Sequence, residues 1–331
     1  MNEEIKIYFL NVGQGDTTFI KLPDKKIIMI DFNHDPKGIH LINFLKDYTK
    51  DNKNKIDYLI NTHPDKDHVR RIDELEKNGI DYGSLYDSTL RKEKENGKEY
   101  PEYDAYIVFL EKAEKAKKVK YIERGLDYFP GLKFYWGDIK FYMPDKDYRD
   151  EKLDSGMINR KSAIVQLDFY GTKIIFTADT DLHTYKEDLK NWSDFQFKEL
   201  SSKVLQASHH GSRSFFKDKE EDEPYREALD AIKPDSVFVS VGKDNEYNLP
   251  HKDAMDIYKE DKRKVYRSDE DGTVIATLRY LNNKVEIDID PDNTIDTDYA
   301  WEKDDKNNKN SGGVFIESTG GPAILGGNPK G

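Results

Sequence analysis

Apolar residues in the first third of the chain fall into short blocks that are separated by turns and by one helical pattern. The blocks at residues 5–10, 17–22, 27–31 and 55–61 are short, and glycine, proline or polar turns bound most of them. Such runs are typical of buried strands, whereas apolar positions three and four residues apart, as at 37–50, are typical of helices. The first third is therefore predicted to begin a sheet that packs against a helix.

The rest of the chain continues this alternation. After a polar stretch at 81–103, helices are predicted at 104–118, 224–232 and 251–260, and strands at 134–136, 139–143, 162–169, 173–177, 203–207, 236–241, 273–279 and 284–289. Strands and helices that alternate in two similar halves predict an α/β protein with two stacked sheets between helices.

A change of composition marks the end of this pattern at residue 290. Residues 1–290 are predicted to form one domain. Residues 291–331 are rich in Asp, Asn, Lys and Gly and show little periodicity, so we expect a flexible tail that could bind a protein partner. No apolar run approaches the ~18 residues that a membrane span needs, and the acidic N-terminus does not resemble a secretory signal. These features predict a soluble, cytoplasmic protein.

Charge and cysteine content restrict the chemistry. The net charge of −12 should repel a polyanion, unless basic residues gather locally or metal ions supply positive charge. The chain has no cysteine, so any metal must be held by histidines and carboxylates.

A turn that follows the predicted strand at 55–61 places four such groups together as H-x-D-x-D-H, namely His63, Asp65, Asp67 and His68. A helical pattern follows it at 69–78. Two carboxylates and two imidazoles this close would be costly without a cation, because of charge repulsion and desolvation. The turn therefore predicts a metal site, with a solvated turn as the alternative.

Further acidic and imidazole groups stand at the ends of other predicted strands: Asp31, Asp179, His209, His210 and His251. A single Asp or His at such a position is ordinarily a cap or a surface group. Several of them at one rim of a sheet predict an active site.

The order of seven motifs in residues 5 to about 280 resembles the metallo-β-lactamase fold, and more closely its branch found as the soluble hydrolase domain of the competence protein ComEC. The motifs lie at 10–16, 63–68, 159–162, 177–179, 208–212, 240–247 and 267–272. The resemblance implies a four-layer αβ/βα sandwich, two mixed sheets flanked by helices, with a two-metal site at the sheet rim.

The resemblance also implies the metal ligands: His63 and Asp65 on one ion, Asp67 and His68 on the other, Asp179 between the two ions and His209 completing the second site. An oxygen-rich donor set favours manganese, while the imidazoles keep zinc open. Asp67 and His210 are the expected catalytic groups, and His210 either protonates the leaving group or supports a ligand. Asp31 and Asn159 are expected to orient ligands. The expected substrate contacts are Arg70, Ser212, Asn245 and His251.

Three motifs depart from the family pattern. Asn11 replaces the usual aspartate of the first motif, Arg70 and Arg71 replace a pair of glycines, and Leu249 stands where a histidine is expected. His251 is the nearest histidine that could take the place of the missing one.

The predicted function is a metal-dependent hydrolase, favoured as a phosphodiesterase or nuclease that uses a hydroxide activated by two metals. Two adjacent cations lower the pKa of a shared water and stabilise charge on the attacked and leaving oxygens. The partner would be nucleic acid or a small phosphodiester. One alternative is a hydrolase of another ester, lactone or amide, against which Asp65 weighs because such enzymes carry a histidine there. The other is a partner-dependent module whose site is weakened at Leu249.

Overall fold

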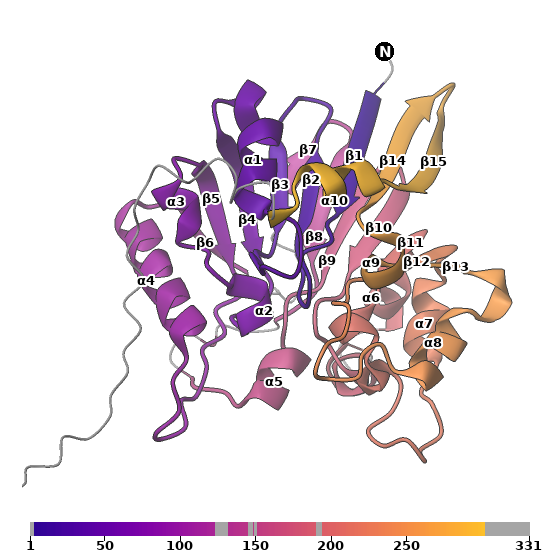
Figure 1. Cartoon of the computed structure of the whole chain (residues 1–331). Helices are drawn as coiled ribbons and strands as arrows, with labels where there is room; N and C mark the ends of the chain where they lie inside the picture. Colours follow the sequence, from indigo (N-terminus) through magenta and orange to yellow (C-terminus); the bar gives the residue numbers. More distant parts are fainter. Residues whose placement is uncertain (1–2, 123–131, 145–147, 149–150, 190–193, 302–331) are drawn as a thin grey trace, which may run out of the picture.

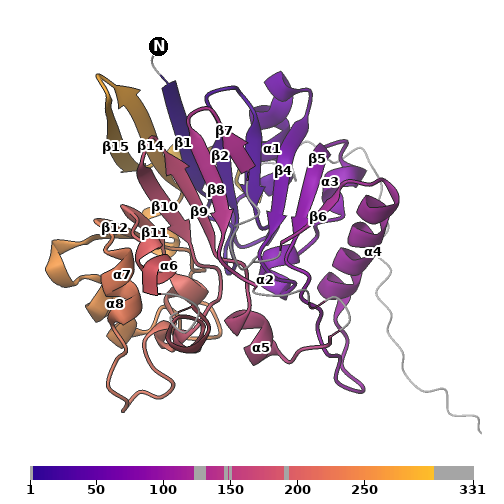
Figure 2. The same cartoon turned by 180° about the vertical axis from the view of Figure 1, so that it is seen from behind.

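Two β-sheets lie face to face in the middle of the molecule, and helices cover their outer faces (Figures 1 and 2). The computed structural model describes residues 3–122, 132–144, 148, 151–189 and 194–301. Within these residues the backbone forms one eight-stranded and one seven-stranded sheet.

The eight-stranded sheet has the order β15-β14-β1-β2-β3-β4-β5-β6. Its pairings are antiparallel from β15 to β3 and parallel from β3 to β6. Its strands are β1 Glu3–Phe9, β2 Thr18–Lys21, β3 Ile27–Ile30, β4 Lys55–Asn61, β5 Asp81–Asp87, β6 Val119–Tyr121, β14 Val274–Leu281 and β15 Lys284–Pro291.

The seven-stranded sheet has the order β13-β12-β11-β10-β9-β8-β7. It is antiparallel from β7 to β10 and parallel from β10 to β13. Its strands are β7 Leu132–Phe134, β8 Gly137–Phe141, β9 Val165–Phe169, β10 Thr172–Phe176, β11 Val204–Gln206, β12 Ser236–Val239 and β13 Lys264–Arg267. Both sheets are therefore mixed.

The helices are α1 Leu41–Thr49, α2 Lys66–Val69, α3 Glu74–Lys77, α4 Pro101–Lys115, α5 Ser155–Arg160, α6 Asp194–Glu199, α7 Glu227–Ile232, α8 Lys252–Tyr258, α9 Ser268–Asp271 and α10 Asn293–Asp298. Short 3-10 turns lie at η1 Lys50–Asn52, η3 Ser208–Gly211, η4 Arg213–Phe215 and η5 Glu260–Lys262, and a π-helix, η2, lies at Thr184–Leu189.

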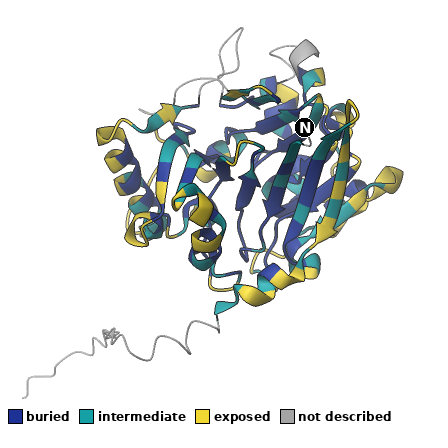
Figure 3. Cartoon of the chain, turned by 90° about the horizontal axis from the view of Figure 1, so that it is seen from above, coloured by how far each residue is buried: buried dark blue, intermediate teal, exposed yellow. Residues whose placement is uncertain are grey.

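Three apolar clusters separate four layers. One lies between the eight-stranded sheet and α1, α3 and α4, a second lies between the two sheets, and a third lies between the seven-stranded sheet and α7 and α8. Phe9 of β1 stacks on Phe238 of β12 across the middle cluster, with ring centroids 4.5 Å apart. Figure 3 shows buried residues gathered in the sheets and exposed residues on the outer sides of helices. The predicted architecture of two mixed sheets flanked by helices is confirmed.

Two local predictions were wrong. The polar stretch at 81–103 contains strand β5, of which Tyr82, Leu85 and Asp87 are buried. Gly83 and Ser84 interrupt the apolar residues, so the strand has no regular alternation, and pairing with β4 and β6 decides the conformation. The helix predicted at 69–78 is broken, because Arg71 has a left-handed backbone (φ 57°) between α2 and α3.

The first residues of the predicted tail pack on the domain. Helix α10 buries Ile295, and the Trp301 ring lies against the rings of His34 and His40, at centroid distances of 4.7 and 4.4 Å. Residues 302–331 lie outside the described part, so a flexible tail and its protein partner stay predictions. Across the described residues, no helix is long and apolar enough to span a membrane.

Candidate metal centre

The acidic and imidazole groups meet where the parallel strands of both sheets end. Asp31 follows β3, the turn of residues 62–68 follows β4, Asp179 follows β10, and His209 and His210 follow β11. The carboxyl ends of parallel strands meet at one edge of a sheet, where functional loops ordinarily gather. Two stacked sheets therefore bring their loops to a shared rim.

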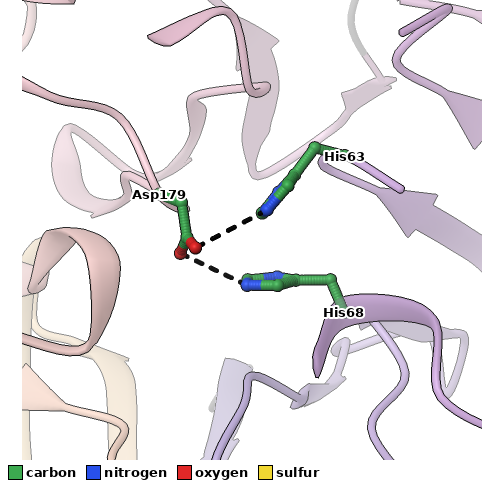
Figure 4. Close-up of side chains that lie close together, drawn as sticks. All are labelled: His63, His68 and Asp179. Carbon is green, nitrogen blue, oxygen red and sulfur yellow. Dashed lines mark ion pairs between the residues drawn. The ribbon is translucent and has the colours of Figure 1, made fainter. Parts of the chain in front are cut away.

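His63, His68 and Asp179 form the centre of this rim and point toward one another (Figure 4). The distance from His63 Nε2 to Asp179 Oδ2 is 3.6 Å, and that from His68 Nε2 to Asp179 Oδ1 is 3.2 Å. All three side chains are buried, yet His63 Nε2, His68 Nε2 and Asp179 Oδ1 have no hydrogen-bond partner. Buried polar atoms without partners are uncommon and call for a ligand.

A second group joins Asp67 and His210 to His68. His210 Nδ1 donates a hydrogen bond to the Ser240 carbonyl (2.9 Å), and its Nε2 lies 3.1 Å from Asp67 Oδ2. Both ring nitrogens of His210 therefore face acceptors. Such a ring must carry two protons, or a cation must lie between Nε2 and the carboxylate.

The electrostatics of the metal-free centre follow from this crowding. Burial lowers the pKa of His68, but Asp179 and Asp31 outweigh it and hold the pKa well above its ordinary value. Burial likewise opposes the shift of His210, whose pKa Asp179 and Asp16 raise to about 10. The imidazoles thus hold protons that compensate the carboxylates, and a divalent cation can replace those protons.

The donors fit a divalent metal ion. They are imidazole nitrogens and carboxylate oxygens, all of them accepted ligands of zinc and manganese, and their unpartnered atoms converge. Burial raises the pKa of the Asp179 carboxyl, but His209 and His68 bring it well below its usual value, so this carboxylate stays ionised and able to bind a cation.

Asp31 holds His68 from behind. Its carboxylate accepts hydrogen bonds from Thr62 N (2.8 Å), from Thr62 Oγ1 (2.7 Å) and from His68 Nδ1 (2.8 Å). With Nδ1 occupied in this way, Nε2 of His68 is the atom that faces Asp179. A carboxylate behind a histidine is the usual means of fixing the orientation of a ligand imidazole.

Asp65 and His209 are placed differently from the other expected ligands. Asp65 belongs to neither of the two donor groups found among the described residues, and its Oδ1 lies 2.7 Å from Lys92 Nζ. His209 Nε2 lies 3.7 Å from Asp179 Oδ2, and 30% of the His209 side chain is exposed, so it stands at the outer side of the centre.

Arg70 and Asn245 line a pocket of about 330 Å³ beside Asp67. Arg70 forms an ion pair with Asp35. The Asn245 side chain donates to the Gly242 and Leu249 carbonyls and accepts from two backbone amides of the same loop. Asn245 therefore shapes the loop that forms one wall of the pocket.

The other expected residues make local contacts. Ser212 Oγ accepts a hydrogen bond from Ser214 N, and His251 Nδ1 accepts one from Arg213 N. Asn159 lies in α5, and its Oδ1 is buried without a hydrogen-bond partner.

Two residues at the rim were not among the site residues predicted from the sequence. Lys92 is one, since it lies in the polar stretch at 81–103, where no site residue was predicted. Asp16 is the other: it is buried, its Oδ1 lies 3.8 Å from His210 Nδ1, and its amide donates to the Asp67 carbonyl (3.1 Å). Burial raises the pKa of Asp16, while His210 opposes this shift. Its position at the end of the motif at 10–16 was the available signal.

Asn11, one of the three departures from the family pattern, contacts helix α10. Its side-chain amide donates to Asp296 Oδ2 (2.7 Å), and its backbone amide donates to Thr273 Oγ1 (3.1 Å). The amide is a donor that an aspartate could not supply, so this departure suits the docking of α10.

No family model matches the chain, and no curated protein matches it significantly. Among solved structures it is similar to a diphosphatase of the PhnP family (12% identity, TM-score 0.42, covering 84% of this chain and 98% of that one). It is also similar to a long form of RNase Z from yeast (11%, 0.42, 92% and 44%), of which it spans less than half. A third is an archaeal metallo-beta-lactamase superfamily protein from Sulfolobus tokodaii (18%, 0.36, 69% and 84%). These similarities are distant and carry no argument about function.

Proposed function

We propose that the chain is a metal-dependent hydrolase that cleaves phosphodiesters, as a nuclease or a phosphodiesterase. The observation that carries the proposal is that buried atoms of His63, His68 and Asp179, all able to bind a metal ion, converge without hydrogen-bond partners. The order of the sequence motifs resembles that of the soluble domain of ComEC, and this resemblance supports the same hypothesis.

In our proposal Asp179 and the histidines around it would hold the two divalent ions, manganese or zinc. Its Oδ1 faces His68 Nε2 (3.2 Å) and His210 Nε2 (3.8 Å), whereas its Oδ2 faces His63 Nε2 (3.6 Å) and His209 Nε2 (3.7 Å). A carboxylate with histidines on both of its oxygens is suited to bridge two cations. We add His210 to the proposed ligands, which already include Asp67, because both ring nitrogens of His210 face acceptors.

When bound, such ions supply positive charge to a phosphodiester and lower the pKa of water near them. The residues of the pocket beside Asp67 would hold the substrate. Lys37, Lys66 and Arg70 line it and offer cations to phosphate oxygens, and the Tyr247 ring, 56% exposed, offers a surface for stacking a base. Asp35, Asp67, Asp244 and Glu246 line the same pocket, so these cations do not make it positive overall, and bound metal ions would have to supply the remaining charge.

A metal and substrate panel tests the proposal. The purified protein is stripped with chelator, reloaded with manganese or zinc, and incubated with labelled single- and double-stranded DNA, RNA and a small phosphodiester. We expect cleavage that depends on the metal and that falls at least about 100-fold in Asp179→Asn, because the bridging charge is lost.

The matched control is Asp181→Asn, which alters a carboxylate of the same loop that accepts a hydrogen bond from Thr184 N (3.0 Å). It should retain most of the activity. Cleavage that is equal in Asp179→Asn and the unmodified protein, or a protein that takes up no metal, would refute the proposal.

A further inference from the structure

The ammonium group of Lys92 lies against Asp65, the member of the ligand turn that stands apart from both donor groups. The Nζ to Oδ1 distance is 2.7 Å, and only 11% of the Lys92 side chain and 16% of the Asp65 side chain are exposed. Solvent screens a pair this buried much less than a surface ion pair. Lys92 therefore neutralises Asp65 in the metal-free protein.

The chain holds Lys92 in this place from several sides. The neighbouring Arg91 forms an ion pair with the buried Asp87 at the end of β5 (3.0 Å). The Lys92 amide donates to the hydroxyl of Tyr103 in α4 (3.1 Å), and its backbone forms a bridge with Leu153. The contact with Asp65 is thus built by three separate parts of the chain and is not the chance position of a long surface side chain.

An ammonium group and a divalent cation would compete for the same carboxylate. Asp65 pairs with Lys92, and His63 lies with His68 and Asp179 in a group that does not include Asp65. The donors on the other side, Asp67 and His210, face each other directly at 3.1 Å, with no lysine between them. The two halves of the centre therefore differ in what a metal ion must displace.

We propose that Lys92 competes with a metal ion for Asp65, so that the two ions bind in order. The half of the centre built on Asp67 and His210 fills first, and the half built on His63 and Asp65 fills only at higher metal concentration. This inference rests on the metal centre of the proposed function. It adds a residue that sets how much metal the complete centre requires.

A displaced Lys92 ammonium group could move toward the ring of Tyr100. Lys92 Nζ lies 5.6 Å from the centre of the Tyr100 ring. Lys92 also lines a pocket of about 550 Å³, whose other residues include the acidic Glu93 and Asp104 as well as the basic Arg91, Lys94 and Lys152. A cation near an aromatic face is attracted to the ring. The side chain can thus leave Asp65 without losing every favourable contact.

Metal stoichiometry tests the inference without any activity assay. The chelator-stripped protein is dialysed against graded free manganese, and bound metal per chain is measured by mass spectrometry. The unmodified protein should bind a first ion at lower manganese than a second. In Lys92→Met the second ion should bind at roughly tenfold lower manganese, because a charged competitor for the Asp65 carboxylate is gone.

Lys94→Met is the matched control, since the Lys94 side chain is 47% exposed and pairs with Asp104 instead. Its binding curve should coincide with that of the unmodified protein. Adding Asp65→Asn to Lys92→Met should remove the gain. Lys92→Gln, with circular dichroism of each variant, serves if the methionine variant does not fold.

The outcomes separate this inference from the proposed function. Coinciding curves for Lys92→Met, Lys92→Gln and the unmodified protein overturn the role of Lys92 and leave the metal centre standing. A single ion at all concentrations in every protein also overturns it. Absence of bound metal from every protein overturns both the inference and the proposed function.

Discussion

Replacing Asp31 by asparagine tests whether the carboxylate behind His68 sets the metal affinity of the centre. Asparagine has nearly the same shape and tolerates the left-handed backbone of this position (φ 58°). The change therefore removes charge and acceptor capacity while keeping the space filled.

The magnitude follows from the three hydrogen bonds that Asp31 accepts, two from Thr62 and one from His68 Nδ1. An amide has one acceptor oxygen, so its NH2 group must face either Thr62 or His68, both of which donate. We expect metal affinity to fall roughly 10- to 100-fold, which corresponds to about 1.4–2.7 kcal/mol. The free energy of unfolding without metal should fall by roughly 1.5–3 kcal/mol.

The assay is competition for manganese against a chelator of known affinity, with urea unfolding in excess chelator for the stability. Asp57→Asn is the matched control. The Asp57 carboxylate accepts from Ile27 N (2.9 Å) and from Asn52 Nδ2 (2.8 Å), and it stands near the start of β4, away from the ligand turn. It should lose stability and keep its metal affinity.

Two results would refute the reasoning. One is an Asp31→Asn protein that folds and binds manganese as tightly as the unmodified protein. The other is an equal loss of affinity in Asp57→Asn, which would show that affinity follows general stability and not the orientation of His68.

Three further predictions concern pH, the first motif and the C-terminal segment. The folded-state pKa of His210, about 10, lies above its ordinary 6.5, so its stabilising contribution is full below pH 6.5 and is lost as pH rises toward 10. Thermal unfolding in chelator should show this loss, while manganese affinity should rise over the same range as the proton leaves. Gly15→Ala should destabilise the fold by several kcal/mol and weaken metal binding, because the backbone at residue 15 has φ 139° and the added Cβ would lie 2.3 Å from the Asp67 carbonyl oxygen. The control is Gly79→Ala, which has open space around it and should lower the free energy of unfolding by only about 1 kcal/mol. Trp301→Ala should lower the free energy of unfolding by roughly 1–3 kcal/mol in denaturant titrations, because its ring covers the domain.

Each of these has a clear contrary result. Stability in chelator that stays flat or rises between pH 6.5 and 10 would contradict the raised pKa of His210. Equal stability of the two glycine variants would show that the motif at 10–16 does not support the ligand turn. An unchanged free energy of unfolding in Trp301→Ala would place residues 299–301 outside the folded domain.

The sequence alone predicted what depends on local pattern. Short apolar blocks indicated the strands, because a buried strand needs few residues and its side chains alternate. The H-x-D-x-D-H turn indicated a metal site, since groups within six residues must be close in any fold. Strand β5 was missed because Gly83 and Ser84 interrupt its apolar residues, so its buried positions do not alternate.

The tertiary structure decided which distant side chains meet. His210 and Asp67 are 143 residues apart in the chain and 3.1 Å apart in space, and the order of the strands sets that contact. Lys92 lies in a stretch that is merely polar in sequence, and contacts with β5 and α4 place its backbone beside Asp65. Residue type and spacing in the sequence indicate a candidate cation site. The packing of two sheets determines which atoms surround it, because side-chain contacts between separate strands follow from sheet pairing and not from any local periodicity.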